Sequence, residues 1–170
     1  MTDSASLRIG QGFDIHRFSG VPGRPLVLGG VTIPGVAGLA GHSDADVVTH
    51  ALADALLGAV RLGDLGRHFP DTDPALSGAD SLGLLATVAS LVEGEGMQVV
   101  NADCTVICER PRLAEHAPDM GRRLEAVLRA PVSVKATRAE GLGALGRVEG
   151  IACLAVVLVG ARAAPSGASP

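Results

Sequence analysis

The sequence predicts one α/β or α+β domain, because strand-like apolar segments alternate with helix-like segments along most of its 170 residues. This length favours a single domain and suffices to bury a hydrophobic core. No repeat or linker divides the chain, and local patterns do not determine the strand order. Aromatic residues make up only 2% of the chain, so the core must be packed mainly from Val, Leu, Ile and Ala.

Strands are predicted where short alternating or β-branched apolar runs lie between turn residues. The first strand covers residues 7–16. A hairpin follows, with strands at 26–28 and 31–33, since Gly29 and Gly30 suit the positive φ angles of a tight turn. Three later strands are expected, at 98–108, 132–137 and 151–159.

Three helices are predicted between these strands. In the first, Ser43 followed three residues later by Asp46 resembles an acidic capping box, and Gly58 suits a helix end. The second helix begins at Asp80 or Ser81 and runs to about residue 94, and the third covers 117–129.

Composition excludes several classes of protein. A net charge of −4 and the lack of a basic stripe with aromatic residues argue against nucleic-acid binding. No apolar run approaches the roughly 18 residues needed to cross a bilayer, and the first residues lack the features of a signal peptide. We therefore expect a cytoplasmic protein that does not bind membranes. Its three cysteines lack a zinc-ribbon spacing and are expected to be buried and reduced.

Asp14 and His16 form the first candidate for a chemical site. Residues two apart in an extended segment project to the same side, so these two side chains share one face of the first strand. With a second histidine, His50, they would make a set of one carboxylate and two imidazoles. Such a set suits zinc or a similar divalent cation and leaves one coordination position for substrate. Spacing alone does not establish the pairing with His50.

His50 lies on the helix predicted over 43–58, at four-residue spacing from Asp46 and Asp54. A histidine with a carboxylate one turn away on each side is expected to be held in the tautomer that binds metal. The alternative is a solvated polar stripe that contains an ordinary hydrogen-bonded histidine.

A series of motifs occurs in order along the chain. The segments are Arg8–His16, Gly41–Asp46, Asp54–Gly58, Leu62–Gly66, Phe69–Pro74 and Gly78–Ser81. By this series, the chain resembles the 2-C-methyl-D-erythritol 2,4-cyclodiphosphate synthase family over about residues 7–160. The resemblance implies a mixed sheet covered by helices on one side, in a homotrimer whose active sites are shared between neighbouring subunits. Residues 1–6 and 161–170 are then expected to be tails, the latter disordered.

The resemblance also implies a reaction. The substrate would be a nucleotide diphosphate, 4-diphosphocytidyl-2-C-methyl-D-erythritol 2-phosphate, whose 2-phosphate attacks the β-phosphorus and expels CMP. This lyase reaction belongs to the non-mevalonate pathway of isoprenoid biosynthesis. The metals implied are Zn²⁺ on Asp14, His16 and His50, and Mg²⁺ or Mn²⁺ at the diphosphate with Glu140 as ligand.

Further roles follow from the same resemblance. His42 would stabilise the transition state as the catalytic residue. The implied substrate-binding residues are Asp14, Ile15, His16, His42, Ser43, Asp64, Leu65, Gly66, Phe69, Pro70, Asp71, Thr72, Asp73, Pro111, Arg112, Leu113, Ala136, Thr137, Glu140 and Arg147. Of these residues, Pro111, Arg112, Leu113, Ala136 and Thr137 would form the cytidine pocket. Turn and helix capping is the alternative for Asp71 and Asp73.

The chain departs from the family pattern in one segment. Arg138 stands where the family has a threonine that helps to stabilise the transition state, and Ala144 replaces a phenylalanine that faces the substrate. Our hypothesis is that Arg138 substitutes for the threonine, because its forked donors suit phosphate oxygens. The rival hypothesis is a weakened enzyme or an arginine turned to solvent.

Two alternative functions remain open at this level. One is a metal-dependent phosphohydrolase that uses the same Asp/His/His site with water as nucleophile. The other is a non-catalytic trimer that binds metal or an isoprenoid diphosphate. The run 141–146 also has the glycine spacing of a dinucleotide-binding loop, but a β-rich stretch follows it, so we interpret it as a turn.

Overall fold

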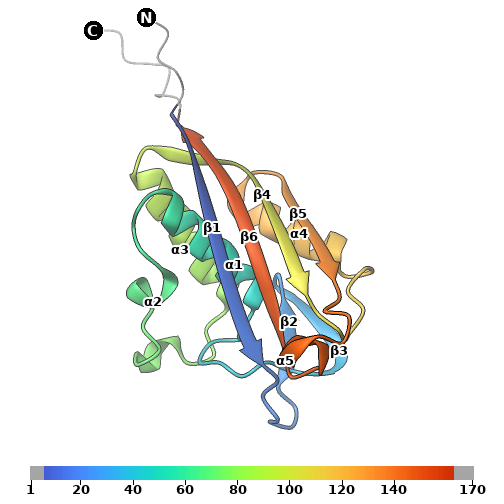
Figure 1. Ribbon diagram of the computed structural model, residues 1–170. Coiled ribbons are helices and arrows are strands. Elements are labelled where there is room, and N and C mark those ends of the chain that lie inside the picture. The colour runs from blue at the N-terminus through green and yellow to red at the C-terminus, as the bar shows by residue number, and fades with distance from the viewer. Residues whose placement is uncertain (1–5, 163–170) are drawn as a thin grey trace, which may run out of the picture.

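The computed structural model describes residues 6–162 as one mixed four-stranded sheet with helices on one face (Figure 1). The strand order is β1-β6-β4-β5, in which β4 and β5 are parallel and the other neighbours are antiparallel. These strands are β1 (Leu7–Arg17), β4 (Met97–Ile107), β5 (Val132–Thr137) and β6 (Gly150–Ala161). The expected mixed sheet with helices on one side is confirmed.

The hairpin predicted around two glycines is also present. It consists of β2 (Pro25–Leu28) and β3 (Val31–Ala37), which form a separate two-stranded sheet. Gly29 and Gly30 have φ angles of 54° and 71°, as the tight turn requires.

Helix α1 (Val47–Ala59) packs on β1 and β6, with α3 (Ser81–Gly94) beside it, and α4 (Ala117–Leu128) packs against β5. Short helices that local patterns did not predict are α2 (Leu65–His68), the 3₁₀ helix Pro74–Leu76 and α5 (Gly143–Gly146). No helix of the described residues is long and apolar enough to cross a membrane. The tail predicted for 161–170 lies outside the described residues, except for Ala161, which ends β6, and Arg162.

The first helix begins four residues later than predicted. Asp46 is its N-cap residue, and its carboxylate accepts the backbone N–H groups of Val48 and Thr49. The same carboxylate accepts the N–H groups of Gly29 and Gly30 at 2.8 and 2.7 Å, so it also joins the helix to the hairpin. Because Asp46 has this non-helical role, the segment before it remains a loop.

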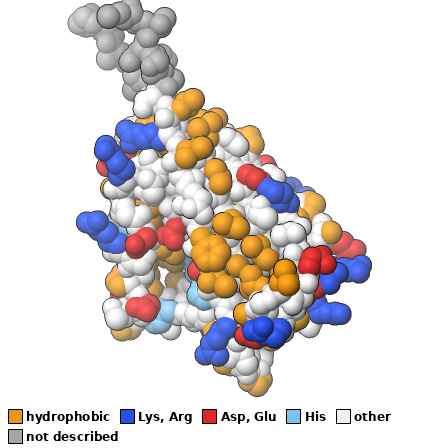
Figure 2. All heavy atoms as spheres, viewed as in Figure 1, with side chains coloured by type: hydrophobic (Ala, Val, Ile, Leu, Met, Phe, Trp, Pro, Cys, Tyr) orange, Lys and Arg blue, Asp and Glu red, His pale blue; other side chains and the backbone are white. Residues whose placement is uncertain are grey.

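The two faces of β1 have different functions. Gly10 and Gly12 lie against α1, where a Cβ atom would come within 1.9 Å of the carbonyl oxygens of Ala55 and Ala51. The alternate residues of β1 point to the other side of the sheet, where Phe13 and Ile15 are half exposed. Figure 2 shows the hydrophobic side chains gathered on this outer face of the sheet.

The glycines on the inner face predict a specific effect on stability. We expect Gly12→Ala to destabilise the fold by at least about 2 kcal/mol, because the new methyl group overlaps the α1 backbone and not a flexible side chain. The measurement is urea unfolding at fixed protein concentration. The matched control is Gly83→Ala on the exposed side of α3, where a Cβ meets nothing within 4 Å. We expect that variant to gain up to about 1 kcal/mol from helix propensity. Equal unfolding midpoints for the two variants would contradict the close packing of β1 on α1.

Candidate metal centre and nucleotide-sized cavity

Asp14, His16 and His50 meet at the end of β1 that lies against the start of α1. One ligand atom from each residue lies within 4.8 Å of the other two. Oδ2 of Asp14 is 3.1 Å from Nδ1 of His50 and 3.2 Å from Nε2 of His16. The tertiary structure therefore brings together the three residues whose pairing could not be derived from spacing.

The charges of this cluster favour an ionised carboxylate. Burial alone would raise the pKa of Asp14, but hydrogen bonds and charge interactions with His16 and His50 outweigh it and hold that pKa well below its usual range. The hydrogen bond to Asp14 raises the pKa of His16, although burial opposes this. A carboxylate between two imidazoles attracts either a proton or a metal cation, so this donor set fits a divalent cation.

Each histidine has one nitrogen held by a partner outside the cluster. Nδ1 of His16 lies 2.6 Å from the carbonyl oxygen of Ala40, which only accepts hydrogen bonds, so Nδ1 donates and, in the neutral ring, Nε2 keeps its lone pair for a cation. Nε2 of His50 faces the hydroxyl oxygens of Ser81 and Ser43 at 2.8 and 3.2 Å. This leaves Nδ1 of His50 facing Asp14.

The expectation that Asp46 and Asp54 hold the tautomer of His50 is wrong. Asp46 caps α1, as described above, and Asp54 accepts the backbone N–H of Leu65 at 2.7 Å. Burial raises the pKa of Asp54. Four-residue spacing places these carboxylates on the same helix stripe as His50, but the hydrogen-bond partners of its imidazole are Asp14, Ser43 and Ser81.

The loop that contains His42 and Ser43 borders the metal cluster. The Arg24 guanidinium donates to the carbonyl oxygens of Gly41 and Ser43 at 3.0 and 2.5 Å and thereby holds this loop. His42 itself is exposed, and its Nε2 lies 3.0 Å from the carbonyl oxygen of Asp73. The loop at 41–43 is thus tied to the segment at 69–73 that the resemblance assigns to substrate.

Several of the acidic residues expected in the substrate site have capping roles in the structure. Asp64 is the N-cap of α2 and accepts the N–H of Arg67, and Asp73 caps the 3₁₀ helix by accepting the N–H of Ala75. Phe69 is half-buried at the end of α2, whereas residues 70–73 are exposed. Ile15 contributes its backbone to the metal end of β1, because its side chain points to the outer face of the sheet.

A cavity of about 1040 Å³ lies at the opposite edge of the sheet. The segment 108–114 and the last residues of β5 line it, together with Val36 and Ala117. Five of the residues expected to bind cytidine are among those that line it, namely Pro111, Arg112, Leu113, Ala136 and Thr137. Four cationic side chains but only one carboxylate line this cavity, so it suits an anionic ligand.

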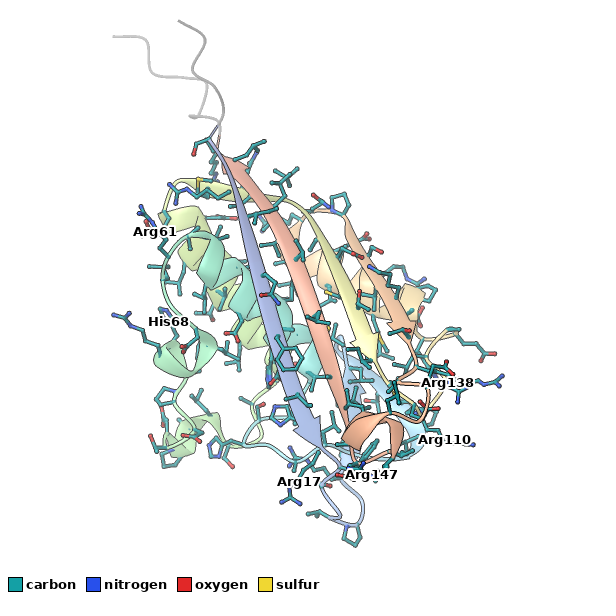
Figure 3. All side chains as sticks on the ribbon, viewed as in Figure 1. Arg17, Arg61, His68, Arg110, Arg138 and Arg147 are labelled. Atoms are coloured by element: carbon teal, nitrogen blue, oxygen red, sulfur yellow. The ribbon has the colours of Figure 1, made fainter. Side chains whose placement is uncertain are left out.

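Arg138 lies at this cavity, on the same side of the molecule as Arg110 (Figure 3). Its guanidinium donates to Oε1 of Glu109, from Nε at 2.9 Å and also from Nη2. This pairing lowers the pKa of Glu109. The guanidinium side chain is 61% exposed, so it combines a fixed anchor with access to solvent.

Glu140 and Arg147 lie outside both the metal cluster and the cavity. Glu140 is exposed in the turn after β5, with a φ angle of 51°. Arg147 follows α5, and its Nε donates to Oε1 of Glu149 at 2.6 Å, with both side chains more than half exposed. Within one chain, Glu140 is not part of the Asp14, His16 and His50 cluster.

Sequence reasoning missed Ser81, Asp44 and Arg24 as parts of the metal centre. Ser81 and Asp44 belong to two motifs of the series, Gly78–Ser81 and Gly41–Asp46, and their place in these motifs was the available signal. Arg24 carries no local signal, because its role depends on a contact with a loop 17 to 19 residues away.

Comparisons with known proteins agree with this geometry. A curated relative from Geobacillus kaustophilus, named 2-C-methyl-D-erythritol 2,4-cyclodiphosphate synthase, is 58% identical over 89% of this chain and 97% of its own length. The bifunctional IspDF from Campylobacter jejuni has a TM-score of 0.88 at 39% identity, covering 93% of this chain and 43% of that longer chain. The structure of Plasmodium falciparum IspF in complex with CDP has a TM-score of 0.80 at 30% identity, covering 93% and 98%.

The family assignment rests on both kinds of match. The model of the YgbB family matches residues 7–160, which include every residue of the metal cluster and of the cavity. Because this match spans most of the sequence and the Geobacillus relative is similar over nearly its full length, the chain belongs to the YgbB family.

Proposed function

We propose that this chain is a 2-C-methyl-D-erythritol 2,4-cyclodiphosphate synthase of the non-mevalonate pathway of isoprenoid biosynthesis. The observation that carries the proposal is the convergence of Asp14, His16 and His50 in a chain that is 58% identical to a relative of that name. Its substrate would be 4-diphosphocytidyl-2-C-methyl-D-erythritol 2-phosphate. A cytoplasmic location agrees with the three cysteines, which are all free and buried.

In the proposed reaction, an oxygen of the 2-phosphate attacks the β-phosphorus of the diphosphate. The bond from this phosphorus to the CMP oxygen breaks, CMP leaves, and no water is consumed. The difficulty is to bring two anionic groups together, so the protein acts mainly by positioning and by neutralising charge. Arg112, Lys135 and Arg138 supply positive charge around the cavity.

Two cations fit the residues present. Asp14, His16 and His50 offer one oxygen and two nitrogens, which suits Zn²⁺ with an open position for substrate. Glu140 would hold Mg²⁺ or Mn²⁺, which takes few protein ligands and completes its coordination with phosphate oxygens and water. When bound, these cations would neutralise the diphosphate and orient it.

The remaining residues would bind and orient the substrate. Ser43 and His42 adjoin the metal cluster, and His42 would stabilise charge that develops during the attack. The stretches 64–66 and 69–73 would hold the methylerythritol phosphate, and 111–113 with 136–137 the cytidine. Arg147 would lie near the trimer axis with Glu149, at a position that could contact an isoprenoid diphosphate.

The positions of the metal cluster and the cavity support a site shared between subunits of a homotrimer. Asp14 and His16 lie on β1, whereas Ala136 and Thr137 lie on β5, at the other edge of the sheet. Three strand spacings separate these edges by about 14 Å. A neighbouring subunit is therefore proposed to bring its cavity to the metal centre of the first.

The exposed apolar face offers a surface for that assembly. On the outer face of β1 and β6, the side chains of Ile9, Phe13, Leu154 and Val156 are between 37% and 71% exposed. Phe13 lies opposite Leu154, and Val156 lies diagonally between Phe13 and Ile9. In Figure 2 the hydrophobic side chains lie together over these two strands. Contiguous apolar surface of this kind marks an interaction site.

The reaction is tested by ³¹P NMR of the purified protein with the diphosphocytidyl substrate, Mg²⁺ and Zn²⁺. We expect CMP and a cyclic diphosphate to appear, and both to be lost in His50→Ala because one of the three metal ligands is removed. His116→Ala is the matched control, since this histidine makes no capping hydrogen bond and does not line the cavity. Release of inorganic phosphate would instead support a phosphohydrolase, and intact substrate with a metal-loaded, folded protein would support a non-catalytic binding trimer.

The shared site predicts that disrupting the apolar face abolishes activity without touching either cluster. We expect Val156→Asp to give a monomer by light scattering and to lose turnover, because a charge cannot be buried in the subunit interface without a partner. The control Val21→Asp makes the same exchange at an exposed valine in the loop between β1 and β2. A monomer that retains full turnover would contradict a site built from two subunits.

The role of Arg138 is tested by comparing Arg138→Ala with Arg138→Thr. We expect the alanine variant to lose about tenfold or more in kcat, since a charge-assisted hydrogen bond to phosphate contributes about 1.5–3 kcal/mol. The threonine variant should keep more activity than the alanine variant because it restores a hydroxyl donor. Arg122→Ala on the exposed side of α4 controls for the loss of one positive charge. Unchanged turnover in Arg138→Ala would exclude a catalytic role.

A further inference from the structure

Ser81 is a fully buried polar residue whose role the proposed reaction does not explain. It is the first residue of α3, and its Oγ lies 2.8 Å from Nε2 of His50. Its hydroxyl donates to Oδ1 of Asp44, and its backbone N–H donates to Oδ2 of the same carboxylate at 3.1 Å. Asp44, Ser81 and His50 therefore form a chain of hydrogen bonds that ends at the metal cluster.

The number of protons in this chain determines the direction of each hydrogen bond. A serine hydroxyl has one proton, and Ser81 donates it to the carboxylate of Asp44. Asp44 Oδ1 also accepts the N–H of Asp46 at 3.2 Å, so the carboxylate acts only as an acceptor. The Ser81 oxygen must then accept from His50, because two lone pairs would otherwise face each other at 2.8 Å.

We propose that Ser81, oriented by Asp44, is a positioning residue that keeps the proton of neutral His50 on Nε2 and its Nδ1 lone pair free for a divalent cation. This inference rests on the proposed metal centre at Asp14, His16 and His50. Nδ1 is the nitrogen that faces Asp14 at 3.1 Å, so the tautomer selected by Ser81 directs the lone pair toward the other ligands. Partners of this kind orient the ligating histidines of metal sites and increase their metal affinity.

The second hydroxyl near His50 does not take over this role. Ser43 lies farther from Nε2, at 3.2 Å, and its oxygen accepts the N–H of Ala45. Ser43 is half-buried in a loop, whereas Ser81 is fully buried at the start of a 14-residue helix that packs beside α1. Because Ser81 is held more rigidly and lies closer to Nε2, its hydroxyl oxygen is the acceptor of the proton on Nε2.

The tautomer of His16 is determined by a different partner, the Ala40 carbonyl, and here the proton is held on Nδ1 and not on Nε2. Nδ1 of His16 donates its proton in a hydrogen bond to the Ala40 carbonyl oxygen, which leaves the Nε2 lone pair of the neutral ring toward Asp14. A backbone carbonyl cannot be removed by mutation, but the Ser81 hydroxyl can. His50 is therefore the ligand at which the contribution of an outer hydrogen bond is measurable.

The direct test is the protonated nitrogen of His50 in the Zn²⁺-loaded protein, in which a cation would take the place of a proton between Nδ1 and Asp14, read from two-bond ¹H–¹⁵N correlations of the imidazole. We expect a proton on Nε2 and none on Nδ1 in the unmodified protein, and a larger fraction of Nδ1–H in Ser81→Ala at the same limiting Zn²⁺ concentration, because more of that variant is metal-free. A proton on Nδ1 of His50 in the Zn²⁺-loaded unmodified protein would overturn the proposal, and this result does not depend on the folding of any variant.

The second measurement is Co²⁺ affinity, followed by the visible absorption bands of the bound ion. We expect Ser81→Ala to bind Co²⁺ 10–100-fold more weakly and Ser81→Thr, which keeps the hydroxyl, to bind within a few-fold of the unmodified protein. Ser90→Ala is the matched control on the same helix, because its exposed hydroxyl bonds only to the carbonyl oxygen of Ala86. Unchanged affinity in a folded Ser81→Ala variant would overturn the proposal.

His50→Ala separates a failure of this inference from a failure of the metal centre. If the unmodified protein binds Co²⁺ and His50→Ala does not, the metal centre stands and the Ser81 variants alone decide the inference. If both bind Co²⁺ equally, His50 is not a ligand and the proposal fails together with the proposed metal centre.

Discussion

The packing of α1 on β1 without intervening side chains is the constraint on which the site depends. Gly10 and Gly12 present bare backbone to Ala51 and Ala55, so the helix lies directly on the strand. His50 precedes this contact on the helix, and Asp14 follows it on the strand. Any side chain at position 12 would separate the two elements and increase the 3.1 Å distance between the His50 imidazole and the Asp14 carboxylate. Small residues here serve the geometry of the site as much as the density of the core.

A second constraint is the order of the strands. Because β1 and β5 are the two edges of the sheet, the metal cluster and the cavity form at opposite sides of one chain. The apolar outer face of β1 and β6 lies between them. A trimer would thus bury an apolar surface that is costly to expose and complete the site by the same contact.

The aspartates around the metal centre show how one residue type takes several roles. Asp46 joins the start of α1 to the hairpin, Asp54 holds the start of α2, and Asp44 receives two hydrogen bonds from Ser81. Among the carboxylates of residues 6–162, only Asp14 forms ion pairs with two histidines. Burial and the available donors distinguish these carboxylates, and neither is visible in the pattern of charges along the chain.

The sequence by itself determined the strands, the three long helices and the face of β1 that carries Asp14 and His16, because side-chain periodicity and turn residues are local properties. The family resemblance also indicated that His50 belongs with them and that residues 111–113 and 136–137 share one pocket; these five residues line the cavity at β5. The tertiary structure alone decided which hydrogen bonds each side chain makes. Asp46 and Asp54 share a helix stripe with His50, yet the partners of its imidazole are Asp14 and Ser81, which lie 36 and 31 residues away in the chain. Such contacts depend on strand order and on the distance between packed elements, and no local spacing encodes either one.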